Sequence, residues 1–189
     1  MQKKKFIDFN QFNIIAPEIL YTYKVYPRID SFSYLKHSFY IYCYLDPGVC
    51  YLDNKKILQV ETSFKTFYFG YEPFYIGKGV NRVGYRFNHH VNEYIAKRPD
   101  SNVLKHKKLE EIEKNFNKKD YPISSWQEYK KNFIILLINF DNEKDLLRCE
   151  FELINNIGTV YHQGNEKGPL VNQILKYKTD RYRFKKEDF

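Results

Sequence analysis

SFYIYCYL, residues 38–45, is the stretch that decides the fold. It is made largely of β-branched and aromatic residues and runs into the turn sequence DPG at 46–48, so it predicts a strand that ends there. Because side chains alternate along a strand, Tyr40, Tyr42 and Tyr44 are expected on one face. The same pattern is typical of ordinary half-buried strand aromatics.

Further elements are indicated after this stretch by apolar periodicity and by turn residues. Two short aromatic segments before the glycines at 77–79 predict strands, and apolar residues at helical spacing predict helices. In chain order, the predicted elements are strands at 66–69 and 73–76, helices at 82–97 and 102–118, a buried strand at 132–140, and a helix at 142–156 ended by Gly158.

This order of elements predicts a small α/β domain of the α+β kind, with a mostly antiparallel three-stranded sheet flanked by helices. The 189 residues suffice for one such domain and are too few for two domains that each have a sizeable hydrophobic core. We expect the domain to span 36–172, with a hairpin insertion at about 48–70. Residues 1–35 would pack on it as an extension, in a short helix or an irregular wrap, and residues 173–189 would form a basic tail.

The composition favours a folded, basic protein. Aromatic residues make up 19% of the chain, which is too many for a disordered protein. A formal net charge of +8 favours a polyanionic partner, although many basic proteins never bind nucleic acid. The three cysteines show no CxxC pair, which indicates reduced thiols in the cytosol. The apolar run at 133–138 is far shorter than the roughly 20 residues that span a bilayer, so we expect a cytoplasmic protein without a membrane partner.

The glycine-rich segment at 77–79 and the helix expected after it carry the first candidate site residues. Glycines between a strand and a helix let the backbone approach a ligand, and Lys78 would meet a phosphate there, although the Walker spacing is absent. Arg82, Arg86 and His90 are four residues apart and would project from one helix face. That stripe suits a phosphate and a proton-transfer partner, or else it is a solvated basic face.

Glu150 is the acidic candidate, because it lies on the predicted third helix beside Leu153 and Ile154. Next to an apolar stripe it can be an ordinary boundary residue. It can equally be an oxygen ligand for Mg²⁺, which takes one or two protein carboxylates and completes its shell with water and phosphate.

Taken together, these segments resemble the GIY-YIG nuclease family. YIY at 40–42 stands in the place of the first family element, with Tyr where Gly is usual, and YIG at 75–77 matches the second. RFNHH at 86–90 resembles the family's Arg-x-x-x-His. Glu150, in the pattern E-x-x-L-I-x-x-I-G, resembles its metal-binding glutamate, and Asn172 resembles the asparagine that closes the domain.

The resemblance covers residues 38–172 and departs from the family pattern in spacing. YIY and YIG stand farther apart than in the family's usual short hairpin, which implies the insertion at 48–70. The arginine is ambiguous, because Arg86 has His90 four residues on while Arg82 lies nearer the glycines. We expect Arg86 to be catalytic and Arg82 to make a supporting phosphate contact.

The resemblance implies a metal-dependent DNA endonuclease that hydrolyses phosphodiester bonds with one Mg²⁺ or Mn²⁺ ion held by Glu150. Tyr42, or else His90, would take the proton from the attacking water. Tyr75 would position water or phosphate, and Arg86 would pair with the scissile phosphate. Free tyrosine has a pKa of about 10, so Tyr42 would need a neighbouring cation to lower it.

Double-stranded DNA is the partner that the resemblance implies, with Lys78, Arg82, Lys105 and Asn172 as phosphate or DNA contacts. The setting would be a phage, a mobile element or a restriction system, in a bacterial or phage-infected cytosol, and a homodimer would allow both strands to be cut. One alternative is a noncatalytic nucleic-acid-binding protein that keeps this fold, although binding alone has no need of Glu150 near phosphate. Another is a structural phage protein or a host-interaction protein in which the tyrosine strand and the glycine turn are coincidental.

Overall fold

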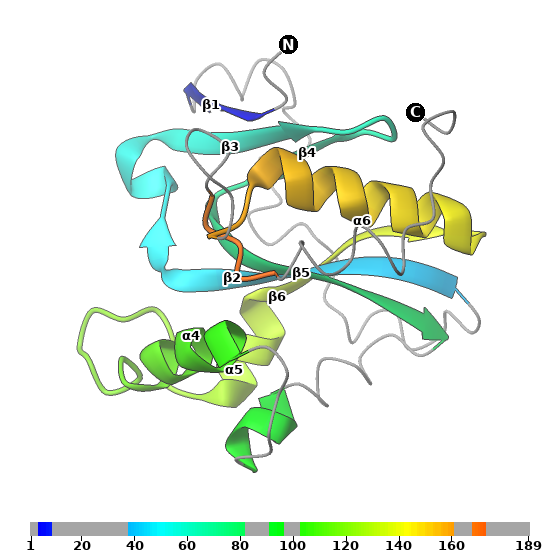
Figure 1. Ribbon diagram of the computed structural model, residues 1–189. Helices are drawn as coiled ribbons and strands as arrows, with labels where there is room; N and C mark the ends of the chain where they lie inside the picture. The colour runs from blue at the N-terminus through cyan, green and yellow to red at the C-terminus, as the bar shows by residue number, and fades with distance from the viewer. Residues whose placement is uncertain (1–3, 9–37, 82–90, 97–102, 161–167, 173–189) are drawn as a thin grey trace.

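The protein is described by a computed structural model that places residues 4–8, 38–81, 91–96, 103–160 and 168–172. Its strands form two antiparallel three-stranded sheets, so the architecture is α+β (Figure 1). The first sheet has the order β1 (Lys4–Asp8), β3 (Lys56–Glu61), β4 (Thr66–Phe69), and the second has the order β5 (Tyr71–Asn81), β2 (Ser38–Cys50), β6 (Ile134–Phe140). The prediction of one three-stranded sheet was therefore incomplete.

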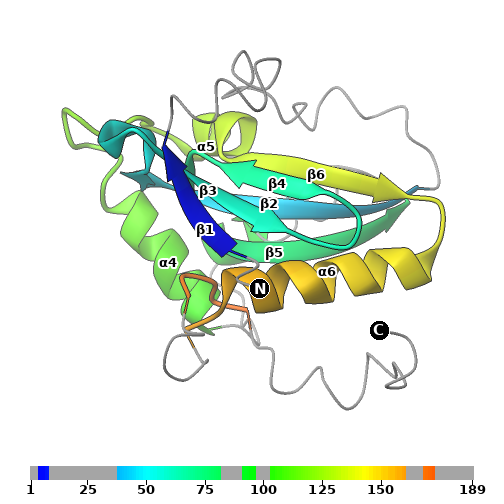
Figure 2. The same cartoon turned by 90° about the horizontal axis from the view of Figure 1, so that it is seen from above.

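The helices lie on both sides of the β5-β2-β6 sheet. The described helices are α4 (Val103–Glu113), α5 (Trp126–Asn132), α6 (Glu143–Ile157) and the short 3-10 helix η2 (Leu52–Asn54), and residues 91–95 are also helical. Helix α6 contacts all three strands of this sheet and also β3, whereas α4 and α5 lie on the other side (Figures 1 and 2). Among these helices of the described chain, none is long and apolar enough to cross a bilayer.

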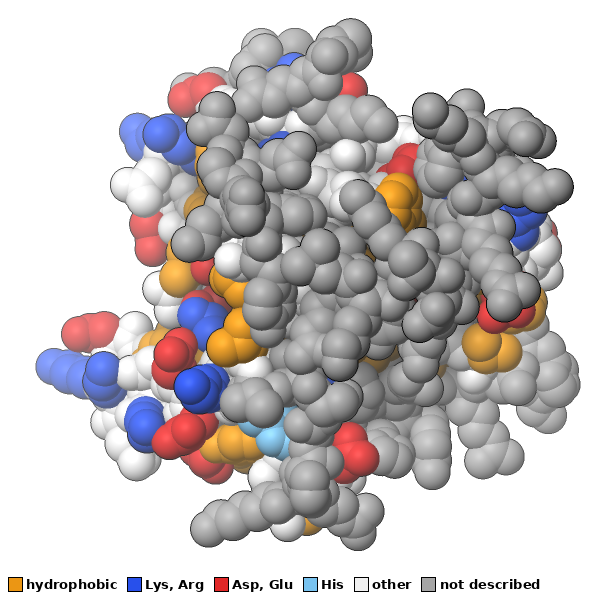
Figure 3. Space-filling view, viewed as in Figure 1, with side chains coloured by type: hydrophobic (Ala, Val, Ile, Leu, Met, Phe, Trp, Pro, Cys, Tyr) orange, Lys and Arg blue, Asp and Glu red, His pale blue; other side chains and the backbone are white. Residues whose placement is uncertain are grey.

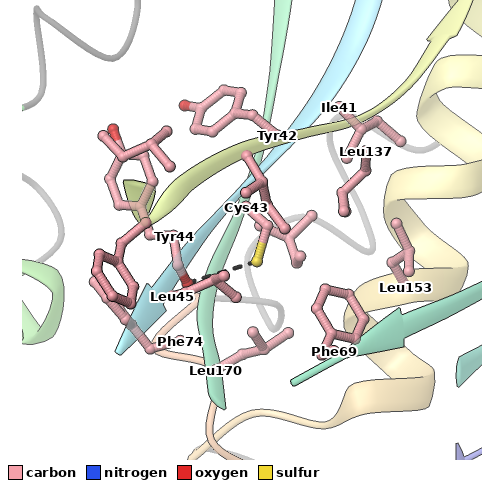
Figure 4. Close-up of a cluster of buried hydrophobic side chains, with 14 of the residues drawn as sticks. Ile41, Tyr42, Cys43, Tyr44, Leu45, Phe69, Phe74, Leu137, Leu153 and Leu170 are labelled. Carbon is pink, nitrogen blue, oxygen red and sulfur yellow. Dashed lines mark hydrogen bonds between the residues drawn. The ribbon is translucent and has the colours of Figure 1, made fainter. Parts of the chain in front are cut away.

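Strand β2 divides its side chains between these two layers, as the alternation in its sequence predicts. Cys43 lies on the same side of the strand as Leu153 of α6 and Phe69 of β4, whereas Tyr42 lies on the other side (Figure 4). The predicted shared face of the tyrosines is thus confirmed. The tyrosines of β2 are fully buried, not half-buried, and Tyr129 of α5 packs edge-on against Tyr44.

Strand β2 does not end at the turn predicted for residues 46–48. It continues to Cys50, and its pairing with β5 shifts register between Asp46 and Cys50. The backbone N–H of Gly48 donates to the Asp46 carboxylate at 2.8 Å, which is a local turn bond made inside the bulge. The turn residues therefore bend the strand without stopping it.

The insertion predicted at about 48–70 is the source of the first sheet. Strand β4 has the predicted bounds, but it pairs with β3, which was not predicted, and not with β2. Strand β1 pairs with the other edge of β3, with Lys4 opposite Val60, and buries Ile7. Residues 4–8 are therefore a strand, and the expectation of a short helix or irregular wrap was wrong for this part of the extension.

Helix boundaries follow the capping residues. Helix α6 begins after Asn142, whose side chain accepts from the Asp145 N–H, and it ends at Gly158 with φ 85°, as expected for a glycine cap. Helix α5 was missed, although Ser125 accepts from the Glu128 N–H at its start. Helix α4 ends at Glu113, short of the predicted residue 118.

Candidate active site

The glycines at 77 and 79 lie inside strand β5, not in a turn that follows it. Gly77 is paired with Tyr42, and Gly79 is paired with Tyr40 on β2. A Cβ atom on Gly77 would lie 2.2 Å from Cζ of Tyr42, and one on Gly79 would lie 2.1 Å from Cζ of Tyr40. These glycines make room for the tyrosine rings of the adjacent strand, which corrects the expectation that they bring the backbone close to a ligand.

On the tyrosine face of the sheet, among the described residues, a lysine lies against Tyr75 of β5. The Tyr75 ring centroid lies 6.2 Å from that of Tyr42 and 5.4 Å from that of Tyr44. Lys105 of α4 places its Nζ over the Tyr75 ring, 5.3 Å from the centroid, and this lysine is only 3% exposed. The predicted DNA contact of Lys105 stays a prediction, but the described position of this ammonium is against a tyrosine.

Lys78 points to the opposite face of the sheet, where it pairs with α6. Its Nζ lies 3.2 Å from Oε2 of Glu150, and the two side chains are 23% and 9% exposed. Glu150 is therefore a buried carboxylate and not an exposed boundary residue. The predicted phosphate contact of Lys78 is untested, and its partner in this structure is the carboxylate.

Asn172 closes the outer edge of β5. Its side-chain oxygen accepts from the Ile76 N–H at 3.0 Å, and its amide donates to the Ile76 carbonyl at 2.6 Å. The neighbouring Val171 N–H donates to the Phe74 carbonyl at 2.8 Å. The structure thus assigns Asn172 a backbone-bridging role at the YIG element, while its predicted DNA contact stays a prediction.

The candidate residues that the structure describes converge on residues 75–78 of β5, although they come from positions up to 130 apart in the chain. They do not all lie on one side. Tyr42 and Tyr75 are on the α4 face, whereas Lys78 and Glu150 are on the α6 face. Arg82, Arg86 and His90 lie outside the described residues.

No family model, curated protein or solved structure matches this chain. The resemblance to GIY-YIG nucleases therefore stays an interpretation of the sequence, and the geometry of the site carries the argument from here.

The donors around Glu150 fit a Mg²⁺ ion only through one carboxylate. No group of three His, Cys, Asp or Glu side chains suited to a metal occurs in the part of the chain that the structure describes. Mg²⁺ does not need such a group, because water and substrate phosphate complete its shell. Glu150 already forms an ion pair with the Lys78 ammonium, which shows that its carboxylate can bind a cation in this position.

A second cluster, partly buried and not indicated by the sequence, lies near the other end of the β2–β5 pair. Asp46 and Glu72 face each other in register, and Lys108 binds Asp46 at 2.6 Å. The Tyr51 hydroxyl donates to Glu72 at 3.3 Å, and burial raises the pKa of both groups. Asp46 gave a turn signal instead, because a bulged strand and a turn use the same residue types.

The surface over α4 is mixed in charge. Lysines alternate there with acidic side chains (Figure 3), and Lys114 pairs with Glu110 at 2.6 Å. The described surface of α4 is therefore not uniformly basic.

Proposed function

We propose that this protein is a metal-dependent phosphodiesterase that cleaves DNA, of the GIY-YIG type. One observation carries the proposal: Tyr42, Tyr75, Glu150 and Asn172, which the sequence marks as family positions, meet around residues 75–78 of an outer strand. Ordinary packing does not require that Tyr42 of β2, Glu150 of α6 and Asn172 all border the segment of β5 that carries Tyr75 and Lys78.

The residues on each face of β5 have different parts in this proposal. On the α4 face, the Lys105 ammonium lies over the Tyr75 ring. Tyr42 would take the proton from the attacking water, and Tyr75 would orient water or phosphate. On the α6 face, Glu150, which pairs with Lys78 in this structure, would hold the divalent ion. When bound, the ion would neutralise charge on the phosphate and assist the leaving oxygen.

One phosphate would reach both groups around the outer edge of β5, next to the stretch that Val171 and Asn172 cover. In the sheet β5-β2-β6, β5 is an outer strand, so no further strand of that sheet separates its two faces at this edge. Asn172 holds the backbone of Ile76, and Ile76 lies between Tyr75 and the Gly77-Lys78 pair. A fixed backbone here would hold the side chains on the two faces of β5 at constant positions relative to each other, as a bound substrate would require.

The Lys78–Glu150 ion pair gives Glu150 a role without catalysis, as the second candidate function, a noncatalytic nucleic-acid-binding protein, requires. In such a protein the carboxylate would serve only to neutralise a partly buried lysine, as many structural ion pairs do.

A plasmid cleavage assay with a matched variant separates the two functions. Supercoiled plasmid is incubated with the full chain in Mg²⁺ or in EDTA, alongside Glu150→Gln and Glu152→Gln. Both glutamates are buried on α6, but Glu152 accepts hydrogen bonds from Ser63, whereas Glu150 pairs with Lys78. Glu152→Gln therefore removes the same charge from the same helix, away from the proposed metal ligand.

We expect nicked or linear product with Mg²⁺ only, at least about 100-fold slower in Glu150→Gln and retained in Glu152→Gln. Cleavage that survives Glu150→Gln would remove this residue from the reaction. Plasmid that shifts on a gel without being cut would favour the noncatalytic function.

A further inference from the structure

The ion pair between Lys78 and Glu150 occupies the carboxylate that the proposed function assigns to the metal. The Nζ···Oε2 distance is 3.2 Å, and the carboxylate is 9% exposed. A Mg²⁺ ion would bind such an oxygen at about 2.0–2.1 Å. Two cations at these distances from one carboxylate would repel each other strongly in a partly buried place.

We propose that Lys78 and a divalent cation compete for Glu150, so that the lysine is a built-in antagonist of metal binding. The inference rests on the proposed function for the assignment of Glu150 as the ligand. It adds that the metal dependence of this protein is set by a residue that does not bind metal.

The backbones on both sides of the pair are held in place. Lys78 is paired with Ile41 in the sheet, two residues from the position that Asn172 bridges. Helix α6 is tied to the β3–β4 turn, because Glu152 accepts from the N–H and the hydroxyl of Ser63 at 2.6 and 2.7 Å. Exchange of partners must therefore occur by side-chain motion.

Of the two side chains, the lysine is the one that moves in this exchange. Lys78 is 23% exposed and has a flexible four-carbon stem, whereas Glu150 is 9% exposed on a packed helix. An incoming ion would displace the ammonium toward solvent and leave the carboxylate where it stands. The site would then pass from lysine-bound to metal-bound without a change of fold.

The chain contains a matched control pair in Lys108 and Asp46. Their separation is 2.6 Å, and the side chains are 24% and 7% exposed, close to the values for Lys78 and Glu150. Substituting either lysine by methionine removes one charge and leaves one buried carboxylate without its lysine. Only the first substitution removes a lysine from the proposed metal ligand.

Mn²⁺ binding to the full chain, measured by titration calorimetry and by the loss of the free Mn²⁺ EPR signal, tests the competition without any cleavage reaction. We expect Lys78→Met to bind Mn²⁺ about tenfold more tightly than the unaltered protein, the scale of one charge-assisted contact. Lys108→Met should stay within about twofold, and Lys78→Arg, which keeps the charge, should not show the gain. Lys78→Met with Glu150→Gln should lose it.

Unchanged or weaker Mn²⁺ binding by Lys78→Met would overturn the competition, and so would an equal gain in Lys108→Met. Lys78→Gln repeats the measurement with a shorter polar side chain, so a folding defect in one variant does not decide the result. If the plasmid is cut but Lys78→Met binds Mn²⁺ as before, the proposed function stands and this inference fails. If Mn²⁺ binding tightens through Glu150 but no DNA is cut, the inference stands and the nuclease proposal fails.

Discussion

Gly77→Ala is expected to destabilise the protein by about 2–3 kcal/mol, because the Tyr42 ring already fills the space that a methyl group would take. The added Cβ would lie 2.2 Å from Cζ, 2.4 Å from the hydroxyl oxygen and 2.6 Å from Cε2 of Tyr42. Overpacking of a core costs about 1–3 kcal/mol, and this contact belongs at the upper end because the ring is 1% exposed. Alanine also lowers the conformational entropy of the unfolded chain, but this stabilises the protein by only about 0.4–1 kcal/mol.

A double-mutant cycle isolates this contact. In a Tyr42→Ala background, which itself loses about 3–5 kcal/mol of packing, Gly77→Ala should cost nothing or stabilise slightly, because the ring is gone. In a Tyr42→Phe background the cost should remain near that in the unaltered protein, since Cζ and Cε2 stay in place. The coupling between Gly77 and Tyr42 should therefore be about 3 kcal/mol.

Urea unfolding followed by circular dichroism measures each corner of the cycle. Equal costs of Gly77→Ala in the presence and absence of the Tyr42 ring would refute the reasoning that this glycine exists to accommodate the tyrosine. It would point instead to a backbone requirement at position 77, for which the described strand geometry gives no reason.

Three further outcomes are expected. Asn172→Ala should lower the free energy of unfolding by about 2–4 kcal/mol, since it strips partners from two backbone groups of Ile76, and faster amide exchange at Ile76 would accompany it; an unchanged exchange rate would contradict this. Burial raises the pKa of the Glu72 carboxyl above its ordinary 4.5, so the folded state binds the carboxyl proton more tightly than the unfolded state does. The contribution of Glu72 to the free energy of unfolding therefore falls as the pH rises above 4.5. Glu72→Gln should therefore gain stability over the unaltered protein from pH 4 to 7 in urea titrations, and parallel pH curves would argue against it. Burial raises the pKa of the Cys43 and Cys149 thiols, whereas Cys50 is only half-buried. Ellman's reagent should therefore modify one cysteine quickly in the folded protein and all three in urea. Fast modification of all three without urea would show that the core opens.

Local signals predicted the elements that local physics decides. Helix α6 could be placed to within a residue or two, because Asn142, Gly158 and the apolar spacing between them each act within a few residues. Helix α5 carried a comparable signal in Ser125 and Glu128, three apart at its start, and a search for that capping pattern would have found it.

Pairing between distant segments was the part that the sequence did not reveal. The segment of β1 is short and half polar, and it becomes a strand because β3, about fifty residues away, offers it an edge. The glycines of β5 show the same limit for the site. Nothing in Gly77 itself tells whether a ligand or a tyrosine ring fills the space beside it, because the cross-strand partner is set by register.

The candidate site was predictable as a set of residues but not as an arrangement. Short motifs in the family's order pointed to Tyr42, Tyr75 and Glu150, and the structure brings them around one strand segment. The partnership of Lys78 with Glu150 and that of Lys105 with Tyr75 depend on how α6 and α4 cross the sheet, which no short sequence pattern encodes.

Asn172 has one more consequence, for how the molecule avoids self-association. An outer strand with open backbone groups can recruit a strand from another molecule, and sheets extended in this way aggregate. At Ile76 the side-chain amide of Asn172 donates and accepts as a peptide group of an incoming strand would. One side chain thus blocks growth of the sheet at the segment where the candidate site lies, and it leaves the side chains on both faces of that strand in place.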